Sequence, residues 1–419
     1  MLYLKEHIEC EGDEQNLELK KEIAELQDEV INLRRYFHMY PELGTREEST
    51  AKVVEEYLNK LGIRTERIFK TGVVGYICGD FSGKTILLRS ELDALPITED
   101  SEEEYRSRID GVMHACGHDA HIAMLLVAAK VLMRHRGELH GTVKLVFQPN
   151  EEEAGAEFMV EEGVLERPEK VSASFAIHLT SRLKSGIIGL SEGPMMAGMH
   201  NIRISLHGPG GHTCAPWETA DPILCAADII QTLQMIQTRE VSALYPTILM
   251  FGSIHAGNAA NIVPDELILE GTLRCLYEYE DGPQKPLERL ARIVNGVCAI
   301  YGITAQIDAT SGGHTVNNDS RLVNMLKTQV FPDIVCNDCI VPYILMGSDD
   351  FSEFARNGVP GVMIYIGSAG ENINSHEPHH TSRFDIDESV MATGVYIHVK
   401  TALVCLKNNT EEEVNYDAI

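Results

Sequence analysis

Apolar positions recur along this chain with two different periods, and the two alternate. Segments with a period near 3.6 residues predict helices, and short continuous apolar runs between them predict buried strands. In the first part of the chain, the expected helices are 16–40, 48–61, 120–135 and 156–162, and the expected strands are 73–77, 85–90, 141–148 and 174–178. Buried strands that alternate with helices predict an α/β fold with a mostly parallel sheet covered on both faces.

The pattern changes after Pro194 and returns near residue 320. Between these points the expected order is strand, helix, strand, strand, helix, strand, at 199–206, 221–239, 247–253, 266–274, 286–301 and 304–309. This is the order of a ferredoxin-like α+β domain. Beyond it, a helix from Ser320, strands at 343–345 and 361–366 and helices at 351–357 and 387–406 are expected. We therefore predict a discontinuous domain, residues 1–194 and 311–419, that carries an inserted domain at 195–310.

Composition narrows the classes of partner. The 419 residues exceed the usual size of a single core, and 63 acidic against 35 basic residues give a net charge of −28. Such a charge excludes nucleic acid and anionic membranes as partners. No apolar run reaches the length of a membrane span, and the first residues lack the layout of a signal peptide. We expect a cytoplasmic protein.

The ten cysteines are scattered along the chain and form no disulfide framework, which fits a reducing compartment. Cys336 and Cys339 make a solitary CxxC motif. A zinc ribbon would need a second pair, so we interpret both as ordinary cysteines with at most a minor redox sensitivity.

The densest group of metal-ligating residue types lies at 113–121, where three histidines, a cysteine and an aspartate precede an apolar helix. Cys116 and His118 can point to the same side only in an extended or turn backbone. A second local pair, which would close a structural site, is missing from this stretch, as is typical of a catalytic site. The alternative is a helix start with Asp119 near the cap and histidines on the surface.

Further candidates stand at the ends of predicted strands, where open α/β sheets bind their ligands. Three carboxylates, residues 151–153, follow one strand, so one could bind a cation while its neighbour accepts a proton. Asp93 follows another strand and could orient a ligating histidine, and His178 ends a third. The segment 375–385 holds three more histidines, among which spacing alone does not choose. A solvated acidic loop and a core histidine are the alternatives.

Two turn-rich segments of the inserted domain, 207–212 and 258–264, carry side chains that could donate hydrogen bonds to an oxyanion. On the residues alone, a simple turn is the favoured interpretation of each.

Eight motifs in order carry a family resemblance: LRR…H…PELG from Leu33, RSELDALPI, HACGHDAH, FQPNEE, GGHTCAPWETADPI, NIVPD…GTLR, GSDDFS and HTSRFDIDE. Together they resemble the di-metal amidohydrolase and carboxypeptidase superfamily that includes aminoacylase and carboxypeptidase G. The nearest branch is that of N-acyl-amino-acid amidohydrolases, with hippurate hydrolases and plant auxin–amino-acid hydrolases. The resemblance runs from residue 33 to 387.

The resemblance implies two divalent metal ions per subunit in the larger, catalytic domain, with zinc or manganese ahead of cobalt or nickel. It gives Glu151 the role of general base and Asp93 that of the aspartate behind a ligand. His380 is preferred to His379 and His376 because it stands four residues before Phe384. The implied metal ligands are Cys116 as the bridge, His118, Glu152, His178 and His380.

The resemblance also implies that the inserted domain is a lid and dimerisation domain. His212 and Asn261 match residues that hold the scissile carbonyl oxygen, often across the interface of a homodimer. Arg274 matches a clamp for the substrate carboxylate, a role that suits the bidentate guanidinium group. The expected reaction is metal-dependent hydrolysis of N-acetyl or N-aroyl amino acids to a carboxylic acid and a free amino acid.

Some positions depart from the family pattern, namely Glu91, Asn150, Glu153 and Asp349. Three alternatives stay open at this point. Cys116 could be a thiol nucleophile paired with His118. The chain could be a dipeptidase or carboxypeptidase of the same superfamily, or a catalytically silent, metal-binding regulatory protein. The presence of both Glu151 and Glu152 argues against the last, because binding alone needs no base beside the ligand.

Overall fold

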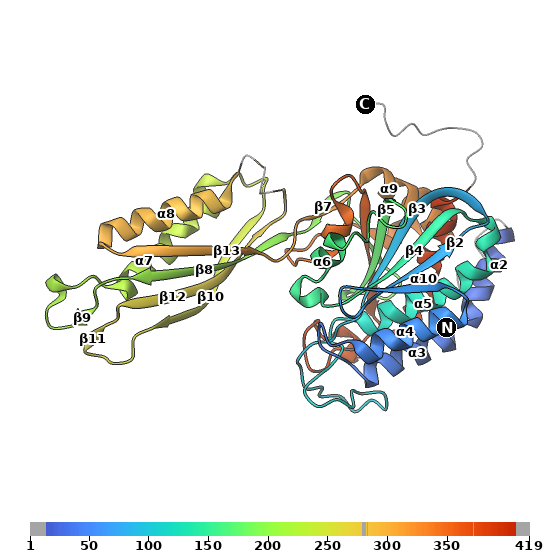
Figure 1. Cartoon of the computed structure of the whole chain (residues 1–419), viewed down its shortest axis with the longest axis horizontal. Coiled ribbons are helices and arrows are strands. Elements are labelled where there is room, and N and C mark those ends of the chain that lie inside the picture. Colours follow the sequence, from blue (N-terminus) through green and yellow to red (C-terminus); the bar gives the residue numbers. More distant parts are fainter. Residues whose placement is uncertain (1–13, 279–281, 283, 372, 408–419) are drawn as a thin grey trace. The chain divides into compact units, whose positions relative to one another are not determined.

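The computed structural model describes residues 14–278, 282, 284–371 and 373–407 of the chain (Figure 1). The chain divides into two compact units: Met1–Gly193 with Asn317–Tyr343 and Asp350–Ile419, and Pro194–Val316 with Ile344–Asp349. The segment Ile344–Asp349, which the sequence pattern assigned to the larger domain, is grouped with the smaller unit. Among the described residues no helix is both long and apolar enough to span a membrane.

The larger unit is built on an eight-stranded sheet. In spatial order its strands are β1 (Arg64–Ile68), β2 (Gly72–Cys78), β4 (His140–Gln148), β3 (Phe81–Glu91), β5 (Val171–Lys184), β16 (Gly361–Ala369), β6 (Ile188–Gly189) and β15 (Ile340–Val341). The central strands β4, β3, β5 and β16 are parallel to one another. Every residue of β16 is buried, as expected for a strand covered on both faces. The prediction of a mostly parallel α/β sheet is confirmed.

One buried helix organises the packing beside this sheet. The helices of the larger unit are α2 (Glu14–Glu25), α3 (Gln27–Met39), α4 (Glu48–Lys60), α5 (His118–Arg134), α6 (Ala156–Glu161), α9 (Ser320–Met325) and α10 (Met391–Cys405). Nearly every residue of α5 is buried, because it contacts β3 on one side and α3 and α10 on others. A helix that is apolar around most of its circumference belongs in such a position. The first residues of α5 are therefore held at a fixed place beside the sheet.

Several predicted elements differ from those observed. The single helix expected at 16–40 is two helices, because a tighter turn at Leu26 separates α2 from α3. The strand expected at 343–345 is wrong: the short strand β15 precedes it, and Leu345 makes only an isolated bridge. The helix expected at 351–357 is a 3-10 helix, Asp350–Ala355. Strand β1 escaped prediction because it is a charged edge strand.

The smaller unit has the strand and helix order expected of a ferredoxin-like domain. Its main elements are β8 (Gly198–His207), α7 (Pro222–Met235), β10 (Thr247–Ala256), β12 (Glu266–Cys275), α8 (Pro286–Tyr301) and β13 (Thr304–Ser311). The antiparallel sheet has the order β10-β12-β8-β13. Alternate apolar residues of these strands share one core with α7 and α8, so both helices cover the same face of the sheet. The other face is not covered by these helices (Figure 1).

Candidate metal centre

The parallel strands of the larger unit bring distant parts of the sequence to one edge of the sheet. Glu91 at the end of β3 is paired with Gln148 at the end of β4. Arg89 is paired with Ala176 of β5, so His178 stands level with Glu91 two residues further along. The residues that follow these strand ends, with the start of α5, therefore form one site at the carboxyl edge.

Cys116 and His118 enter this site through a glycine turn. Gly117, between them, has a φ of 95°, a left-handed conformation that glycine adopts without strain. The Sγ of Cys116, a ring nitrogen of His118 and a carboxylate oxygen of Glu152 all lie within 4.8 Å of one another. The alternative is right that a helix starts here, since α5 begins at His118 with Asp119 in its first turn. Its surface histidines are wrong, because His118 is only 1% exposed.

His118 has one ring nitrogen engaged and one free. Its Nδ1 lies 2.9 Å from the carbonyl oxygen of Asp93, to which it donates. Its Nε2 is buried and has no hydrogen-bond partner among the described residues. A buried ring nitrogen without a partner is unfavourable unless something else, such as a metal ion, satisfies it. The donor set of thiolate, imidazole and carboxylate suits a divalent transition metal.

Asp93 links this histidine to the acidic turn. Its Oδ2 accepts a hydrogen bond from the backbone N–H of Glu152 at 3.0 Å, and its Oδ1 lies 3.5 Å from Nδ1 of His118. Burial alone would raise the pKa of Asp93, but His118 and the N–H of Glu152 stabilise the carboxylate and hold its pKa below the ordinary value. The carboxylate therefore fixes both the histidine and the glutamate.

The turn that carries Glu151 depends on a residue that the sequence analysis missed. Glu47 is fully buried and accepts hydrogen bonds from the N–H of Asn150 at 2.8 Å and the hydroxyl of Thr71 at 2.6 Å. Asn150 has a φ of 57°, which asparagine tolerates better than most residues. Its side chain lies against Gly44, where an added Cβ would meet Asn150 Oδ1 at 2.0 Å. The departure at position 150 is thus accommodated by the glycine of the PELG motif.

Glu151, so placed, stands beside the ligand cluster. Its Oε2 lies 3.7 Å from Nε2 of His118, and its side chain is 11% exposed. A carboxylate that faces the cluster and keeps some access to solvent can exchange a proton with a molecule in the site.

His178 has the protonation state that metal binding requires. Burial, together with the neighbouring rings of His121 and His379, lowers the pKa of His178 well below its ordinary value, so the imidazole is neutral at neutral pH. Its Nδ1 donates to the carbonyl oxygen of Leu179 at 2.6 Å. Its Nε2 lies 3.7 Å from Sγ of Cys116.

The three histidines of the segment 375–385 have different surroundings. His376 contacts the carbonyl oxygen of Gly370 at 2.7 Å through its Nε2. The Nε2 of His379 accepts from the backbone N–H of Ser181 at 3.4 Å. His380 instead places its Nε2 3.3 Å from Oε1 of Glu152. This arrangement supports the choice of His380 as the ligand, which stays a prediction.

A buried chain of charged side chains lies behind the ligands. The ring of His121 contacts Oε2 of Glu91 at 3.0 Å through Nδ1 and accepts the N–H of Leu179 at 3.0 Å through Nε2. Arg89 binds Glu91 and donates to Oδ1 of Asp350 at 3.0 Å. Glu91, His118, His121 and His178 also form a group whose ligand atoms lie within 4.8 Å of one another, but both ring nitrogens of His121 already have hydrogen-bond partners. Residues 89 and 91 stand on the same face of β3, and their alternation is a signal that could have revealed this chain.

A second buried network ties three of the sequence motifs together. Oδ2 of Asp119, in the first turn of α5, lies 2.9 Å from Nε of Arg34 and 2.8 Å from Nδ1 of His38. Arg34 also donates to Oδ1 of Asp385 at 2.7 Å. Burial would lower the pKa of His38, but its hydrogen bonds to Asp119 and Glu99 raise the pKa to about 9. This network holds the start of α5, and hence Cys116 and His118, in place.

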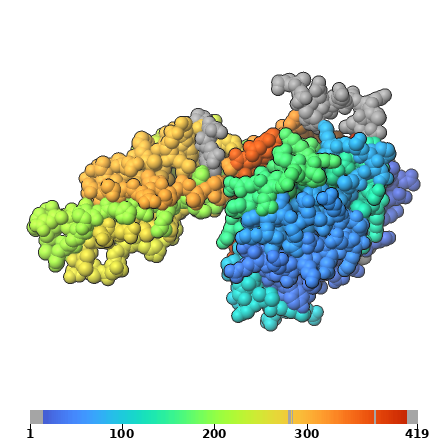
Figure 2. Space-filling model, in the orientation of Figure 1, coloured from blue at the N-terminus to red at the C-terminus, as the bar shows by residue number. Residues whose placement is uncertain are grey.

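The oxyanion candidates His212 and Asn261 lie close together in the smaller unit. The short strands β9 (Gly211–His212) and β11 (Ile262–Val263) pair with each other, and the N–H of Thr213 donates to the carbonyl oxygen of Asn261 at 3.2 Å. Nδ1 of His212 accepts the N–H of Cys214 at 3.1 Å, which leaves Nε2 as a donor. Both side chains are exposed, and Figure 2 shows these two segments at the surface at one end of the unit.

Arg274 is the half-buried cation of the smaller unit's sheet. Its Nη1 donates to the carbonyl oxygen of Met346 at 3.2 Å and lies 3.5 Å from the hydroxyl of Ser348. Within the described ranges it forms no ion pair with a carboxylate. Burial lowers the pKa of Arg274, yet the guanidinium remains charged at any working pH. It is therefore available to an anionic group of a ligand.

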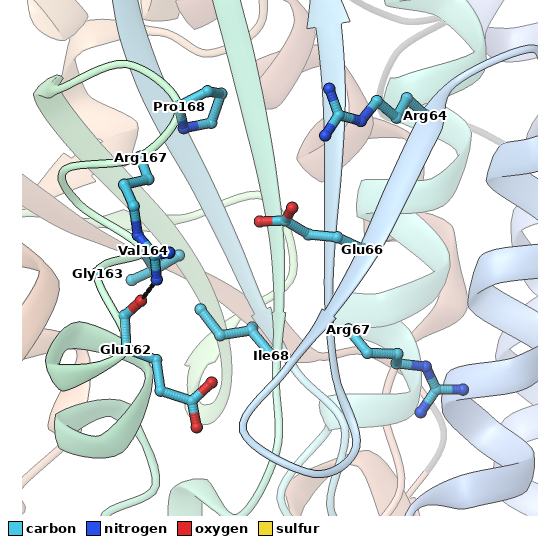
Figure 3. A pocket seen from close by; sticks show the side chains of 9 residues that line it. All are labelled: Arg64, Glu66, Arg67, Ile68, Glu162, Gly163, Val164, Arg167 and Pro168. Carbon is cyan, nitrogen blue, oxygen red and sulfur yellow. Dashed lines mark hydrogen bonds between the residues drawn. The ribbon is translucent and has the colours of Figure 1, made fainter.

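Two further features lie apart from these residues. Cys336 and Cys339 form a disulfide, so their interpretation as ordinary cysteines is wrong. A cavity of about 380 Å³ is lined by β1 and the loop 162–168 (Figure 3). None of the predicted site residues lines it, and Arg167 there is bonded to the backbone of Glu162.

Comparisons with known proteins agree with the motifs. Residues 87–403 match the model of peptidase family M20/M25/M40. The chain is 37% identical to thermostable carboxypeptidase 1 of Saccharolobus solfataricus, over 92% of this chain and 97% of that protein. It is 36% identical to IAA-amino acid hydrolase ILR1-like 2 of Arabidopsis thaliana, over 93% of this chain and 88% of the relative. It is 32% identical to N-acetyl-L-cysteine deacetylase of Bacillus subtilis, over 94% of this chain and 92% of that protein.

A solved structure extends this likeness to the fold. The Bacillus subtilis YXEP protein, described as a dinuclear metal binding peptidase of the M20 family, superposes with a TM-score of 0.78 at 31% identity. The alignment covers 91% of this chain and 99% of that one. This likeness and the clustered ligand atoms support a site for two divalent metal ions. The chain thus belongs to peptidase family M20/M25/M40, and its expected reaction, metal-dependent hydrolysis of an amide bond, is confirmed.

Proposed function

We propose that this protein is a dimeric, cytoplasmic amidohydrolase that cleaves N-acetyl or N-aroyl amino acids to a carboxylic acid and a free amino acid. The observation that carries the proposal is the cluster of Cys116, His118 and Glu152. Among the described residues Nε2 of His118 has no hydrogen-bond partner, and the carboxylate of Glu151 stands 3.7 Å from it.

In this proposal Cys116, His118, Glu152, His178 and His380 hold two divalent metal ions. Zinc or manganese is preferred to cobalt or nickel. Bound metal ions of this kind polarise a carbonyl group and lower the pKa of water from 15.7 to about 7. Cys116 would serve as the ligand shared by the two ions, in keeping with its contact to His178 and its proximity to His118 and Glu152.

Glu151 moves the proton. Its carboxylate takes a proton from the attacking water and returns it to the nitrogen of the leaving amine as the amide bond breaks. The turn fixed by Glu47 and Asp93 keeps this carboxylate at a constant place beside His118. Asp93, behind His118, keeps the ring in the tautomer whose Nε2 is free.

The smaller unit binds the substrate. His212 and Asn261 donate hydrogen bonds to the carbonyl oxygen as it becomes an oxyanion, and Arg274 binds the carboxylate of the amino acid. The exposure of His212 and Asn261 supports their action on a site outside their own surroundings, as in a homodimer whose subunits exchange these residues.

The names of the relatives support the substrate class and leave a second candidate. N-acetyl-L-cysteine is an N-acyl amino acid, whereas the Saccharolobus solfataricus relative is named a carboxypeptidase. A carboxylate clamp at Arg274 would serve either reaction. The difference lies on the other side of the scissile bond, where one class has an acyl group and the other a peptide.

The test is a panel of substrates assayed after each metal is added back to apo-protein. N-acetyl and N-benzoyl amino acids should be cleaved with a kcat/KM well above that of dipeptides with a free N-terminus. A preference for peptides would replace the proposal with the carboxypeptidase function. Turnover that survives in metal-free protein but is lost on alkylation of Cys116 would favour a thiol nucleophile.

A further inference from the structure

The sheet of the smaller unit has one open face, and Arg274 lies on it. Leu273 and Leu249 point to the opposite face, where they join the core under α7 and α8. Because side chains alternate along a strand, Arg274 and Ile248 point away from the helices. The helices thus leave free the face that carries the proposed carboxylate clamp.

Apolar side chains flank Arg274 on this face. In register, Arg274 of β12 is paired with Ile248 of β10 on one side and Met199 of β8 on the other. Cross-strand partners lie side by side on the same face, so the guanidinium stands between these two side chains. In the next row of the same face, Thr272 is paired with Met250, which is 62% exposed.

The segment that supports Arg274 adds to this surface. The carbonyl oxygen of Met346 accepts a hydrogen bond from Arg274. The hydroxyl of Ser348, two residues further on, lies 3.9 Å from Sδ of Met199. This segment therefore lies beside the guanidinium. Glu270, four residues before Arg274 on β12, forms an ion pair with Arg203 of β8. Close to Arg274, the described face therefore offers apolar side chains and no second charge.

A ligand whose carboxylate binds Arg274 must place the side chain on its α-carbon against this surface. We propose that Met199, Ile248 and Met250 form a subsite for the side chain of the released amino acid, and that it selects large apolar side chains such as leucine, methionine and phenylalanine. The proposal rests on the proposed function and specifies its substrate. Methionine, flexible and polarisable, suits a subsite that accepts several apolar shapes.

The experiment measures kcat/KM for the N-acetyl derivatives of leucine, methionine, phenylalanine, alanine, aspartate and lysine with metal-loaded enzyme. The large apolar substrates should exceed the alanine, aspartate and lysine derivatives by about 10- to 100-fold. Met199→Ala should lower the ratio of leucine to alanine derivative several-fold. Met250→Lys, at a largely exposed position that tolerates a charge, should raise the relative rate of the aspartate derivative.

Met235→Ala is the matched control, because Met235 is a part-exposed methionine on α7, on the covered side of the sheet. It should leave all ratios unchanged. Equal rates across the side chains, or a preference for a charged one, would overturn the subsite while leaving N-acyl amino acid hydrolysis intact. Failure to cleave any N-acyl amino acid would overturn the proposed function and the subsite together.

Discussion

The candidate residues of the two units differ in burial: those of the larger unit are mostly buried, and His212 and Asn261 of the smaller unit are exposed. In the larger unit His118 and His178 are buried, and each has its Nδ1 hydrogen-bonded to a backbone carbonyl, which turns its Nε2 toward the cluster. In the smaller unit His212 is exposed, and the contact that fixes its ring is the N–H of Cys214 in its own turn.

In the proposed function this difference separates two tasks. Metal ligands need constant geometry, which the buried networks around Asp93, Glu47 and Asp119 supply. Residues that act on the substrate's oxygen must approach the substrate and move away again, so they are exposed when no substrate is bound. The contrast predicts that damage to the larger unit removes the chemistry altogether, whereas damage to the smaller unit weakens it.

Removal of metal should have the largest effect. Dialysis against a chelator should lower amidase activity by about 1000-fold or more, because the ligand cluster then has nothing to polarise the carbonyl group. Activity should return when zinc, manganese, cobalt or nickel is added singly, and far-UV circular dichroism should stay constant throughout. Full activity in protein shown to be metal-free would contradict the role given to the larger unit.

Substitution of Glu151 should come next. Glu151→Gln should lower kcat by about 10²- to 10⁴-fold, because the proton has no acceptor, while the metal content measured by mass spectrometry stays that of the parent enzyme. Glu153→Gln is the matched control, since Glu153 is an exposed carboxylate in the same turn. Near-normal turnover of Glu151→Gln with its metals bound would refute the general-base assignment.

Substitution of His212 tests the smaller unit. His212→Ala should lower kcat by about 10²- to 10³-fold, the usual loss for one oxyanion donor, with unchanged metal content. His207→Ala, at an exposed histidine five residues earlier, should have little effect.

The same variant tests whether His212 acts across a dimer. Mixed subunits of His212→Ala and Glu151→Gln should regain activity that neither has alone, because one active site then combines both intact residues. An active monomer in sedimentation, or mixtures that stay inactive, would place His212 in its own subunit's site.

Much of the fold follows from the sequence alone. Strong periodicity was enough for the parallel sheet and the ferredoxin-like order. It failed where charge dominates, as at the edge strand β1, and where one turn breaks a continuous amphipathic pattern, as at Leu26. The Cys336–Cys339 pair escaped because spacing does not determine the redox state of a lone CxxC motif.

For the site, the motifs supplied the predicted ligands and Asp93 behind one of them, but not the other residues that hold them in place. Arg34, Asp119 and Asp385 meet in space from three distant parts of the chain, and no local pattern links them. Glu47 stands in a polar segment whose pattern predicts an exposed position, yet it is fully buried. Residues that act through tertiary contacts of this kind become visible only when the fold brings them together.

The smallest expected effect concerns His38, which belongs to the network behind α5. The pKa of His38 is about 9 in the folded protein, above its ordinary value of 6.5, because Asp119 and Glu99 stabilise the imidazolium. Its contribution to stability is therefore complete below pH 6.5 and is lost as the pH rises through 9. We expect His38→Gln to lower the free energy of unfolding by about 1–3 kcal/mol at pH 6.5 and by much less at pH 9.5. Chemical denaturation at both pH values measures the difference, and His255→Gln, at an exposed histidine, is the control. An equal loss of unfolding free energy at pH 6.5 and pH 9.5 would mean that His38 stabilises by packing alone.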